Sequence, residues 1–342
     1  MKRETSKPTG KPPWPITLIA GAEKTGKSYG AAIAAASDLI GGTFWINIGE
    51  DRPDEYGLLA DFEIVSHEGT YRDILAAITD VAAEPPVTPG KPNLLVVDSM
   101  TRMWGLITDN AQATANARAI ANAKRYNKTV PQGDVSISMD LWNVAKSHWG
   151  HIMDAIRAHQ GPAILTARLE SVTVMDNEGK PTKEKQLKVQ AEKSLPFDVG
   201  AVIEMPVRGE TYISGVRSVR LALPERTRVP EFTMDMFWRK LGLHDTETGA
   251  RTHDAPVVEA EKVADEGERD WLADAEAAPT SAEASRIGAA AAVVLGKDHD
   301  TVAAIRDVVA AKRGPLAPES TPADAAPELD PAHPDYIAEA RA

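Results

Sequence analysis

The stretch Gly21-Ala-Glu-Lys-Thr-Gly26-Lys27-Ser28 fits the pattern G-x-x-x-x-G-K-[ST], and the rest of the sequence can be interpreted from it. Its glycines let the backbone curl so that N–H groups point at phosphate oxygens. The apolar run at residues 16–20 is typical of a buried strand, and the alanine-rich segment at 28–40 is typical of a helix. A helix that begins here directs the positive end of its dipole toward the same phosphates.

Each position of this loop has a chemical role in phosphate binding. In a loop of this kind the lysine, here Lys27, reaches the β- and γ-phosphates of a nucleotide, and the hydroxyl of Ser28 is the expected ligand for Mg²⁺. The pattern also occurs by chance in glycine turns, but the strand before it and the helix after it favour a nucleotide site. The motif therefore predicts that phosphate is bound by Gly21, Ala22, Glu23, Lys24, Thr25, Gly26, Lys27 and Ser28.

A second acidic position follows a near-continuous apolar run. Residues 93–97 are typical of a central parallel strand, and Asp98 and Ser99 come directly after them. A carboxylate at such a strand end suits the Mg²⁺ side of a nucleotide site. The alternative is that Asp98 only caps a following helix. With a phosphate loop 70 residues upstream, we predict that Asp98 is a metal ligand together with Ser28.

Strand-like and helix-like segments alternate along residues 14–245. Such alternation predicts a doubly wound α/β fold with a mostly parallel sheet. Residues 105–141 interrupt the pattern with a polar segment and a helix at 111–126, and residues 170–190 are typical of a β-hairpin with strands at 171–175 and 185–190. The other expected strands lie at 43–48, 162–166, 199–205 and 216–223, and the other expected helices at 71–83 and 144–159.

Composition and charge separate the core from the rest of the 342 residues. The chain has no cysteine, which excludes disulfides, thiol catalysis and Cys-ligated metals and fits a reducing cytoplasm. The apolar runs are too short to span a bilayer, so we expect no membrane partner.

Residues 251–342 carry −10 of the net charge of −12. We predict a flexible leader (1–13), the core (14–245), a linker with a small helical module (246–313) and a disordered, proline-rich tail (314–342).

The acidic extension has two interpretations. Helices are expected at 268–277, 281–295 and 301–312. The negative charge could compete with DNA for the core or recruit a basic partner, such as a replication or recombination protein. The alternative is a solubilising extension.

Glu50 follows the β-rich segment at 43–49. Ligands of doubly wound sheets bind at the carboxyl ends of the strands, so an acid here could polarise an attacking water. The alternative is a solvated loop acid beside Asp51 and Asp54. The residues alone favour the solvated loop acid.

Four of these segments together resemble the RecA-like P-loop ATPases, over about residues 14–230. They are the loop at 21–28, the strand Phe44-Trp-Ile-Asn-Ile-Gly-Glu50, the strand Leu95-Val-Val-Asp98-Ser99 and the strand Pro162-Ala-Ile-Leu-Thr-Ala-Arg168. With Leu195-Pro-Phe-Asp198, they look most like the bacteriophage recombinases and single-strand annealing ATPases. The resemblance implies ATP and Mg²⁺ as cofactors, Glu50 as the catalytic glutamate, and Arg168 at the γ-phosphate sensor, where the family usually has Gln.

The resemblance also implies partners. Two segments would face single-stranded DNA, and basic side chains in them would neutralise phosphates. An ordinary solvated hairpin is the alternative. The DNA-contacting residues so implied are Lys180, Lys183, Lys185 and Lys188 of the hairpin and Arg118, Lys124 and Arg125 of the polar segment. Head-to-tail association into a ring or filament is implied as well, with Arg226 and Arg228 reaching a neighbour's nucleotide; surface arginines that balance nearby acids are the alternative.

These features lead to one expected function and two alternatives. The expected function is an ATP-dependent, single-stranded-DNA-binding ATPase of recombination, annealing or repair, encoded by a phage. One alternative is a replicative helicase or packaging motor on the same core. The other is a non-motor P-loop regulator or kinase, because P-loop folds host many functions.

Overall fold

The computed structural model describes residues 5–176, 179–223, 225–244, 247–252, 270–297 and 299–313. The chain divides into two compact units, Met1–Ala255 and Pro256–Ala342. The predicted disordered tail (314–342), most of the linker, and two residues of the hairpin turn lie outside the described residues. Within the described parts, no helix combines the length and apolarity needed to cross a bilayer.

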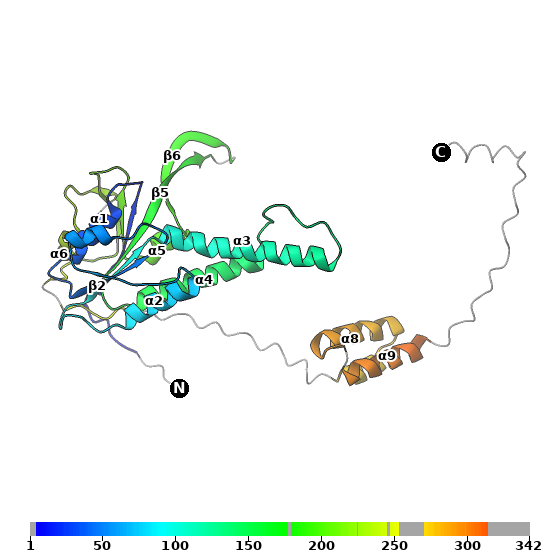
Figure 1. Ribbon diagram of the computed structural model, residues 1–342. Helices are drawn as coiled ribbons and strands as arrows, with labels where there is room; N and C mark the ends of the chain where they lie inside the picture. The colour runs from blue at the N-terminus through cyan, green and yellow to red at the C-terminus, as the bar shows by residue number, and fades with distance from the viewer. Residues whose placement is uncertain are drawn as a thin grey trace, which may run out of the picture. The chain divides into compact units, whose positions relative to one another are not determined.

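The first unit is built on a nine-stranded sheet with the order β3-β2-β4-β5-β1-β7-β8-β9, in which β6 pairs with β5 (Figure 1). The strands from β3 to β7 in this order are parallel, and β6, β8 and β9 pair antiparallel. The strands are β1 (Ile16–Gly21), β2 (Gly42–Asn47), β3 (Glu63–Ile64), β4 (Asn93–Asp98), β5 (Ala163–Met175), β6 (Pro181–Gln190), β7 (Ala201–Met205), β8 (Tyr212–Val216) and β9 (Thr227–Arg228).

Helices cover both faces of this sheet, because alternate residues of the central strands are buried on opposite sides. Leu95 and Val97 of β4 pack with α2, α3 and α4, whereas Leu94 and Val96 pack with α1 and α6. The predicted doubly wound, mostly parallel α/β fold is therefore confirmed. The helices of this unit are α1 (Lys27–Ala35), η1 (a 3-10 turn, Asp54–Leu58), α2 (Tyr71–Ala83), α3 (Met100–Arg125), α4 (Met139–Ala158), α5 (Leu195–Asp198) and α6 (Met234–Lys240).

Three segments differ from the expected ones. The helix expected at 111–126 is the second half of α3, which begins at Met100; α3 and α4 lie side by side and extend away from the sheet as an arm (Figure 1). The strand expected at 162–166 and the first hairpin strand are one strand, β5, which leaves the sheet to form the hairpin with β6. The prediction of a strand at 216–223 was wrong. The strand that pairs with β7 is β8, at Tyr212–Val216. Val219, in the middle of the predicted strand, is fully exposed.

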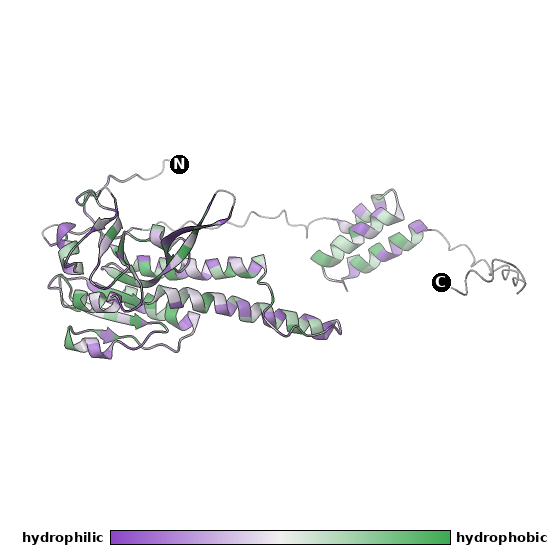
Figure 2. Cartoon of the chain, turned by 90° about the horizontal axis from the view of Figure 1, so that it is seen from above, coloured by the Kyte–Doolittle hydropathy of each residue, from purple (hydrophilic) through white to green (hydrophobic). Residues whose placement is uncertain are grey.

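The second unit, where described, contains α7 (Trp271–Ala277), α8 (Ser281–Val294) and α9 (Asp300–Arg313). Trp271, Ala284 and Ile305 are among the residues of its own small core. Thr280 caps α8, because its side chain accepts a hydrogen bond from the N–H of Glu283. The hydropathy of both units is shown in Figure 2, where the β5–β6 hairpin is largely purple and hydrophilic.

Candidate nucleotide site

The phosphate loop connects β1 to α1 at the carboxyl edge of the sheet. Gly26 has a φ of +102°, a conformation that side chains disfavour, and it ends the loop as the residue before α1. Gly21 has no room for a Cβ, which would lie 2.5 Å from Thr25 Oγ1 and 2.8 Å from the carbonyl oxygen of Met205. Both glycines are thus required by the backbone path. The loop borders a cleft of about 710 Å³, lined also by Asp98 and Glu50.

Lys27 lies in this cleft with its side chain folded along the loop. Its Nζ donates hydrogen bonds of 3.2 Å to Gly21 O and 2.8 Å to Ala22 O. Burial lowers the pKa of Lys27, while the nearby Asp98 carboxylate opposes that shift. A phosphate bound in the cleft would stabilise the charged form of Lys27. Its oxygens would be stronger acceptors for the ammonium than the two loop carbonyls.

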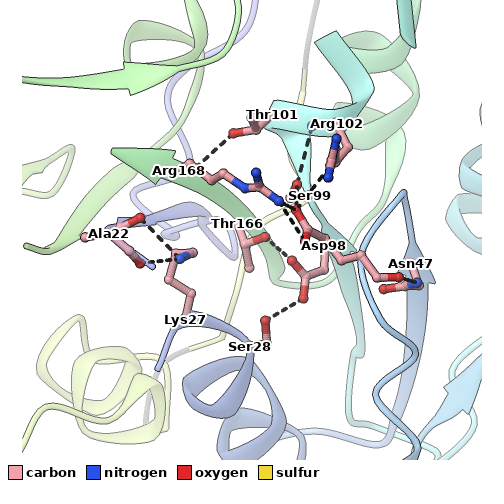
Figure 3. A network of polar contacts seen from close by, with 12 residues as sticks. Ala22, Lys27, Ser28, Asn47, Asp98, Ser99, Thr101, Arg102, Thr166 and Arg168 are labelled. Carbon is pink, nitrogen blue, oxygen red and sulfur yellow. Dashed lines mark hydrogen bonds and ion pairs between the residues drawn. The ribbon is translucent and has the colours of Figure 1, made fainter. Parts of the chain in front are cut away.

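Ser28, Asp98 and Thr166 form a hydrogen-bonded group that joins α1, β4 and β5 (Figure 3). Ser28 Oγ donates to Asp98 Oδ2 over 2.7 Å, and Thr166 Oγ1 donates to Asp98 Oδ1. Asp98 is only 5% exposed, and this burial raises the pKa of its carboxyl, although both hydrogen bonds lower it. Parallel pairing places β4 between β2 and β5, which brings the strand end to the phosphate loop.

These residues fit a magnesium ion. Mg²⁺ is usually held by one or two protein oxygens together with substrate phosphates and waters. Ser28 Oγ and Asp98 Oδ2 supply that number of oxygens beside the loop. Among the described residues there is no group of three or more acids or histidines that could hold a metal alone, so an ion here would depend on the nucleotide.

Glu50 follows β2 and lies in the same cleft. The side-chain amide of Asn47 donates to the Glu50 carbonyl over 2.7 Å, which fixes the backbone. Its carboxylate is 28% exposed and accepts from Arg168 Nη2 at 2.7 and 2.9 Å. Ser99 Oγ also donates to Glu50 Oε1, at 3.1 Å. Glu50 is therefore held inside the site and is not one of the solvated loop acids beside it.

The structure thus brings Lys27, Ser28, Glu50, Asp98 and Arg168 together. It also adds residues that the sequence analysis did not single out. In the sequence, Ser99 is visible only as the residue after Asp98. Thr166 is visible only as a polar residue late in an apolar strand. Arg102 on α3 and Gln190 on β6 also belong to these residues, and neither carries a local sequence signal.

The two predicted DNA-contacting segments lie on separate elements. In the regular part of β6, Lys185 and Lys188 are three residues apart and point to opposite faces of the hairpin, with Glu170 opposite Lys188. Arg118 on the arm pairs with Asp140 at 2.5 Å. Hydrogen bonds from Ser138 and Arg118 lower the pKa of Asp140 to about 2. At the end of α3, Arg125 lies 5.5 Å from the ring of Tyr126, which is 60% exposed.

Arg226 and Arg228 are held differently within the chain. Arg226 Nε lies 2.6 Å from Glu204 Oε2, and its guanidinium lies 3.6 Å from the centre of the Tyr212 ring. Arg228 has a looser ion pair, 3.7 Å from Glu210. Their balancing acids are thus Glu204 and Glu210, from β7 and the following turn. Of the two side chains, that of Arg228 is the more exposed, at 58% against 41% for Arg226.

The strand–loop–helix unit, its glycine geometry and the Ser28–Asp98 contact form the arrangement that the phosphate-loop motif predicts. No family model and no curated protein matches the chain. Two of the solved structures that match are a RadB recombinase (TM-score 0.33, 15% identity, 60% of this chain and 81% of that one) and a prototypical ATPase from the type III secretion system of pathogenic bacteria (TM-score 0.32, 17% identity). The second match covers 56% of this chain and 52% of that chain.

Proposed function

We propose that this chain hydrolyses ATP. The observation that carries the proposal is the hydrogen bond from Ser28 Oγ to Asp98 Oδ2, because it joins the end of the phosphate loop to a buried carboxylate. Lys27 and the loop amides hold the phosphates, and Ser28 and Asp98 hold Mg²⁺. When bound, that ion neutralises charge that develops on the phosphate oxygens. Glu50, beside them in the cleft, orients the attacking water and accepts a proton from it.

The proposed partner is single-stranded DNA. Exposed aromatic rings beside cations are a common platform for single-strand binding, and Arg125 with Tyr126 supplies one at the end of the arm. The lysines of the β5–β6 hairpin supply a second basic surface next to the cleft, because Gln190 at its base lines that cleft. The resemblance to RecA-like proteins supports a role in recombination, annealing or repair, in a phage-infected cytoplasm, as a ring or filament.

A nucleotide-gated regulator is the second candidate function. One observation favours it: both carboxylate oxygens of Glu50 accept from Arg168, so the water-activating group is occupied in this state. A regulator that binds ATP without turning it over would retain this pair. The two candidates therefore differ in turnover and not in nucleotide binding.

The deciding experiment measures ATP hydrolysis by the full chain with Mg²⁺, with and without single-stranded DNA, and measures particle size in parallel. The proposal expects Mg²⁺-dependent hydrolysis that single-stranded DNA stimulates, together with assembly. Duplex DNA of the same length is the control. Stimulation by duplex with unwinding would favour a helicase, and ATP binding without turnover would favour the regulator.

A further inference from the structure

A groove of about 730 Å³ runs between α8 and α9 of the second unit, which lie side by side (Figure 1). Its floor is apolar, because Val302 and Ile305 of α9 are 2% and 1% exposed and pack in the core of the unit. Gly288 of α8 lets the two helices approach closely, since a Cβ there would lie 2.9 Å from Ile305 Cγ2. The described residues that line the groove come from α8, α9 and the turn between them, so α7 leaves this face open.

The rim of the groove is basic. Lys297, Arg306 and Arg313 line it, and all three are exposed. Arg306 Nη2 donates to the carbonyl of Lys297 over 3.1 Å, which ties α9 to the turn before it. None of the described lining residues is acidic. The groove therefore presents three cations around an apolar floor.

Such a groove fits a peptide that carries apolar side chains beside carboxylates. The apolar side chains would be removed from water on the floor, and the carboxylates would form charge-assisted hydrogen bonds with the rim. A nucleic-acid backbone fits less well, because phosphates gain nothing from an apolar floor. Single-strand binders also stack bases on aromatic rings, and the described lining residues include none.

The sequence that follows α9 has the chemistry of such a peptide. Residues 314–342 contain six acids and one arginine, a net charge of −5. The stretches Glu328-Leu-Asp330 and Asp335-Tyr-Ile337 each place apolar side chains beside carboxylates. Because Arg313 lines the groove, the chain also leaves α9 at the groove itself.

The distance to be spanned is short. α9 has 14 residues and is therefore about 21 Å long. Residues 314–328 separate Arg313 from Leu329, and an extended chain of that length spans up to about 50 Å. Both stretches can thus reach every part of the groove. A tethered segment meets its site at an effective concentration of the order of millimolar, which is enough to populate even a weak contact.

We propose that residues 314–342 bind in the α8–α9 groove of their own second unit, with apolar side chains on the floor and carboxylates on the basic rim. The bound segment covers Val302 and Ile305 and neutralises the three cations. This contact does not depend on nucleotide binding or on hydrolysis, so it can fail or hold independently of the proposed function.

The first test measures the fluorescence anisotropy of a labelled synthetic peptide of residues 314–342. The chain truncated after Arg313 is expected to bind this peptide. The full chain should bind it at least about tenfold more weakly, because its own segment occupies the groove. Added salt should weaken the binding. No binding to the truncated chain, or equal binding to both chains, would overturn the proposal.

Variants of the truncated chain locate the contact. Arg306→Gln with Arg313→Gln is expected to weaken peptide binding by about tenfold, as two exposed ion pairs are lost. Ala289→Glu adds an acid to the groove wall and should also weaken it. Arg286→Gln is the matched control, because Arg286 is an exposed arginine of α8 outside the groove. Thermal melts check that each variant folds. Wild-type affinity in both groove variants would contradict the assignment.

Peptide variants separate the floor from the rim. One peptide carries Leu329→Ser, Tyr336→Ser and Ile337→Ser, and another has its six acids replaced by the corresponding amides. Both are expected to bind more weakly than the natural sequence. Full affinity of either peptide would overturn the proposal. Displacement of the labelled peptide by single-stranded DNA would overturn it as well, because the groove would then belong to nucleic acid.

Hydrogen exchange tests the contact in the intact protein. The full chain is compared with a full chain that carries the same three serine substitutions. Amides of α8 and α9 are expected to exchange more slowly in the wild type, because the bound segment suppresses local opening. Amides of α2, in the first unit, are the control. Identical exchange of α8 and α9 in the two chains would show that the groove is empty.

Discussion

Ser28 Oγ lies 2.7 Å from Asp98 Oδ2, although the two residues are 70 positions apart in the chain. Ser28 is in the first turn of the helix after the phosphate loop, and Asp98 ends the buried strand β4. The contact places a hydroxyl and a carboxylate, both suited to Mg²⁺, at the edge of one cleft. The predictions below follow from this site and from the surfaces around it.

Lys27→Ala is expected to abolish hydrolysis and weaken nucleotide binding. Among the described residues, the hydrogen bonds of its ammonium go to the loop carbonyls of Gly21 and Ala22, so the unfolding free energy should change by no more than about 1 kcal/mol. Titration with a fluorescent nucleotide and thermal melts would measure both effects. Lys146→Gln is the control, since Lys146 is an exposed residue of α4 and does not line the cleft. Wild-type turnover in Lys27→Ala would contradict the site.

Asp98→Asn is expected to lose Mg²⁺-dependent hydrolysis and yet unfold less readily at neutral pH. Burial raises the pKa of the Asp98 carboxyl above its ordinary value of 3.8, so the native state binds the proton more tightly than the unfolded state. The contribution of Asp98 to stability is then full below pH 3.8 and falls as the pH rises above it. Asparagine is neutral throughout and removes this dependence.

The measurement is urea unfolding of both proteins, without nucleotide, between pH 4 and about 8. The advantage of Asp98→Asn should grow as the pH rises. A wild type that is more stable than the variant at neutral pH would show that the hydrogen bonds from Ser28 and Thr166 outweigh the burial of the charge.

Glu50→Gln is expected to retain ATP binding and to reduce hydrolysis by about 10² to 10⁴-fold, the usual range for loss of a general base. Glutamine keeps the size of the side chain and cannot accept the proton. Single-turnover hydrolysis and nucleotide affinity, measured on one preparation, would separate the two steps. Weakened affinity with normal turnover at saturation would assign Glu50 to binding.

The two basic surfaces can be compared directly through the salt dependence of DNA binding. Lys185→Ala with Lys188→Ala changes the hairpin, and Lys124→Ala with Arg125→Ala changes the arm. Each phosphate contact that is lost should reduce the slope of log affinity against log salt by about 0.7 for a single strand. Each double variant is the control for the other. If neither changes the slope, both assignments are wrong.

Arg251 anchors the last described segment of the first unit to the sheet. Its guanidinium is partly buried and donates to Trp14 O at 2.6 Å, Gly161 O at 2.8 Å and the carbonyls that end α4. Burial lowers its pKa to about 10, so it remains charged at neutral pH. Arg251→Met should cost about 1–3 kcal/mol of unfolding free energy, because the buried carbonyls lose their donor. Truncation after Gly249 should show the same loss, and truncation after Thr252 should not.

The form truncated after Thr252 also tests the acidic extension. If residues beyond 252 compete with DNA for the basic surfaces, removing them should tighten single-strand binding, most clearly at low salt. Equal affinity of the full and truncated chains at low salt would contradict competition and favour recruitment of a partner or solubility.

Local sequence patterns predicted the features whose conformation depends on residues close together in the chain. The phosphate loop spans eight residues, and its glycines, lysine and serine are interpretable because the backbone path and the helix that follows depend on neighbours in the chain. The same holds for the apolar strands and for the doubly wound fold. Their boundaries were less accurate: the helix expected at 28–40 is Lys27–Ala35, and one expected strand is absent.

By itself, the sequence determined the glycine loop between β1 and α1, the acid that ends β4 and the class of fold, because each depends on short-range periodicity and backbone conformation. Only the tertiary structure decided that Glu50 pairs with Arg168 across 118 positions and that β5 continues from the cleft into the hairpin. It also decided that Arg251 donates to the carbonyl of Trp14. The physical reason is that sheet order and register bring distant strand ends together, and ion pairs between them depend on that placement, which no local pattern records.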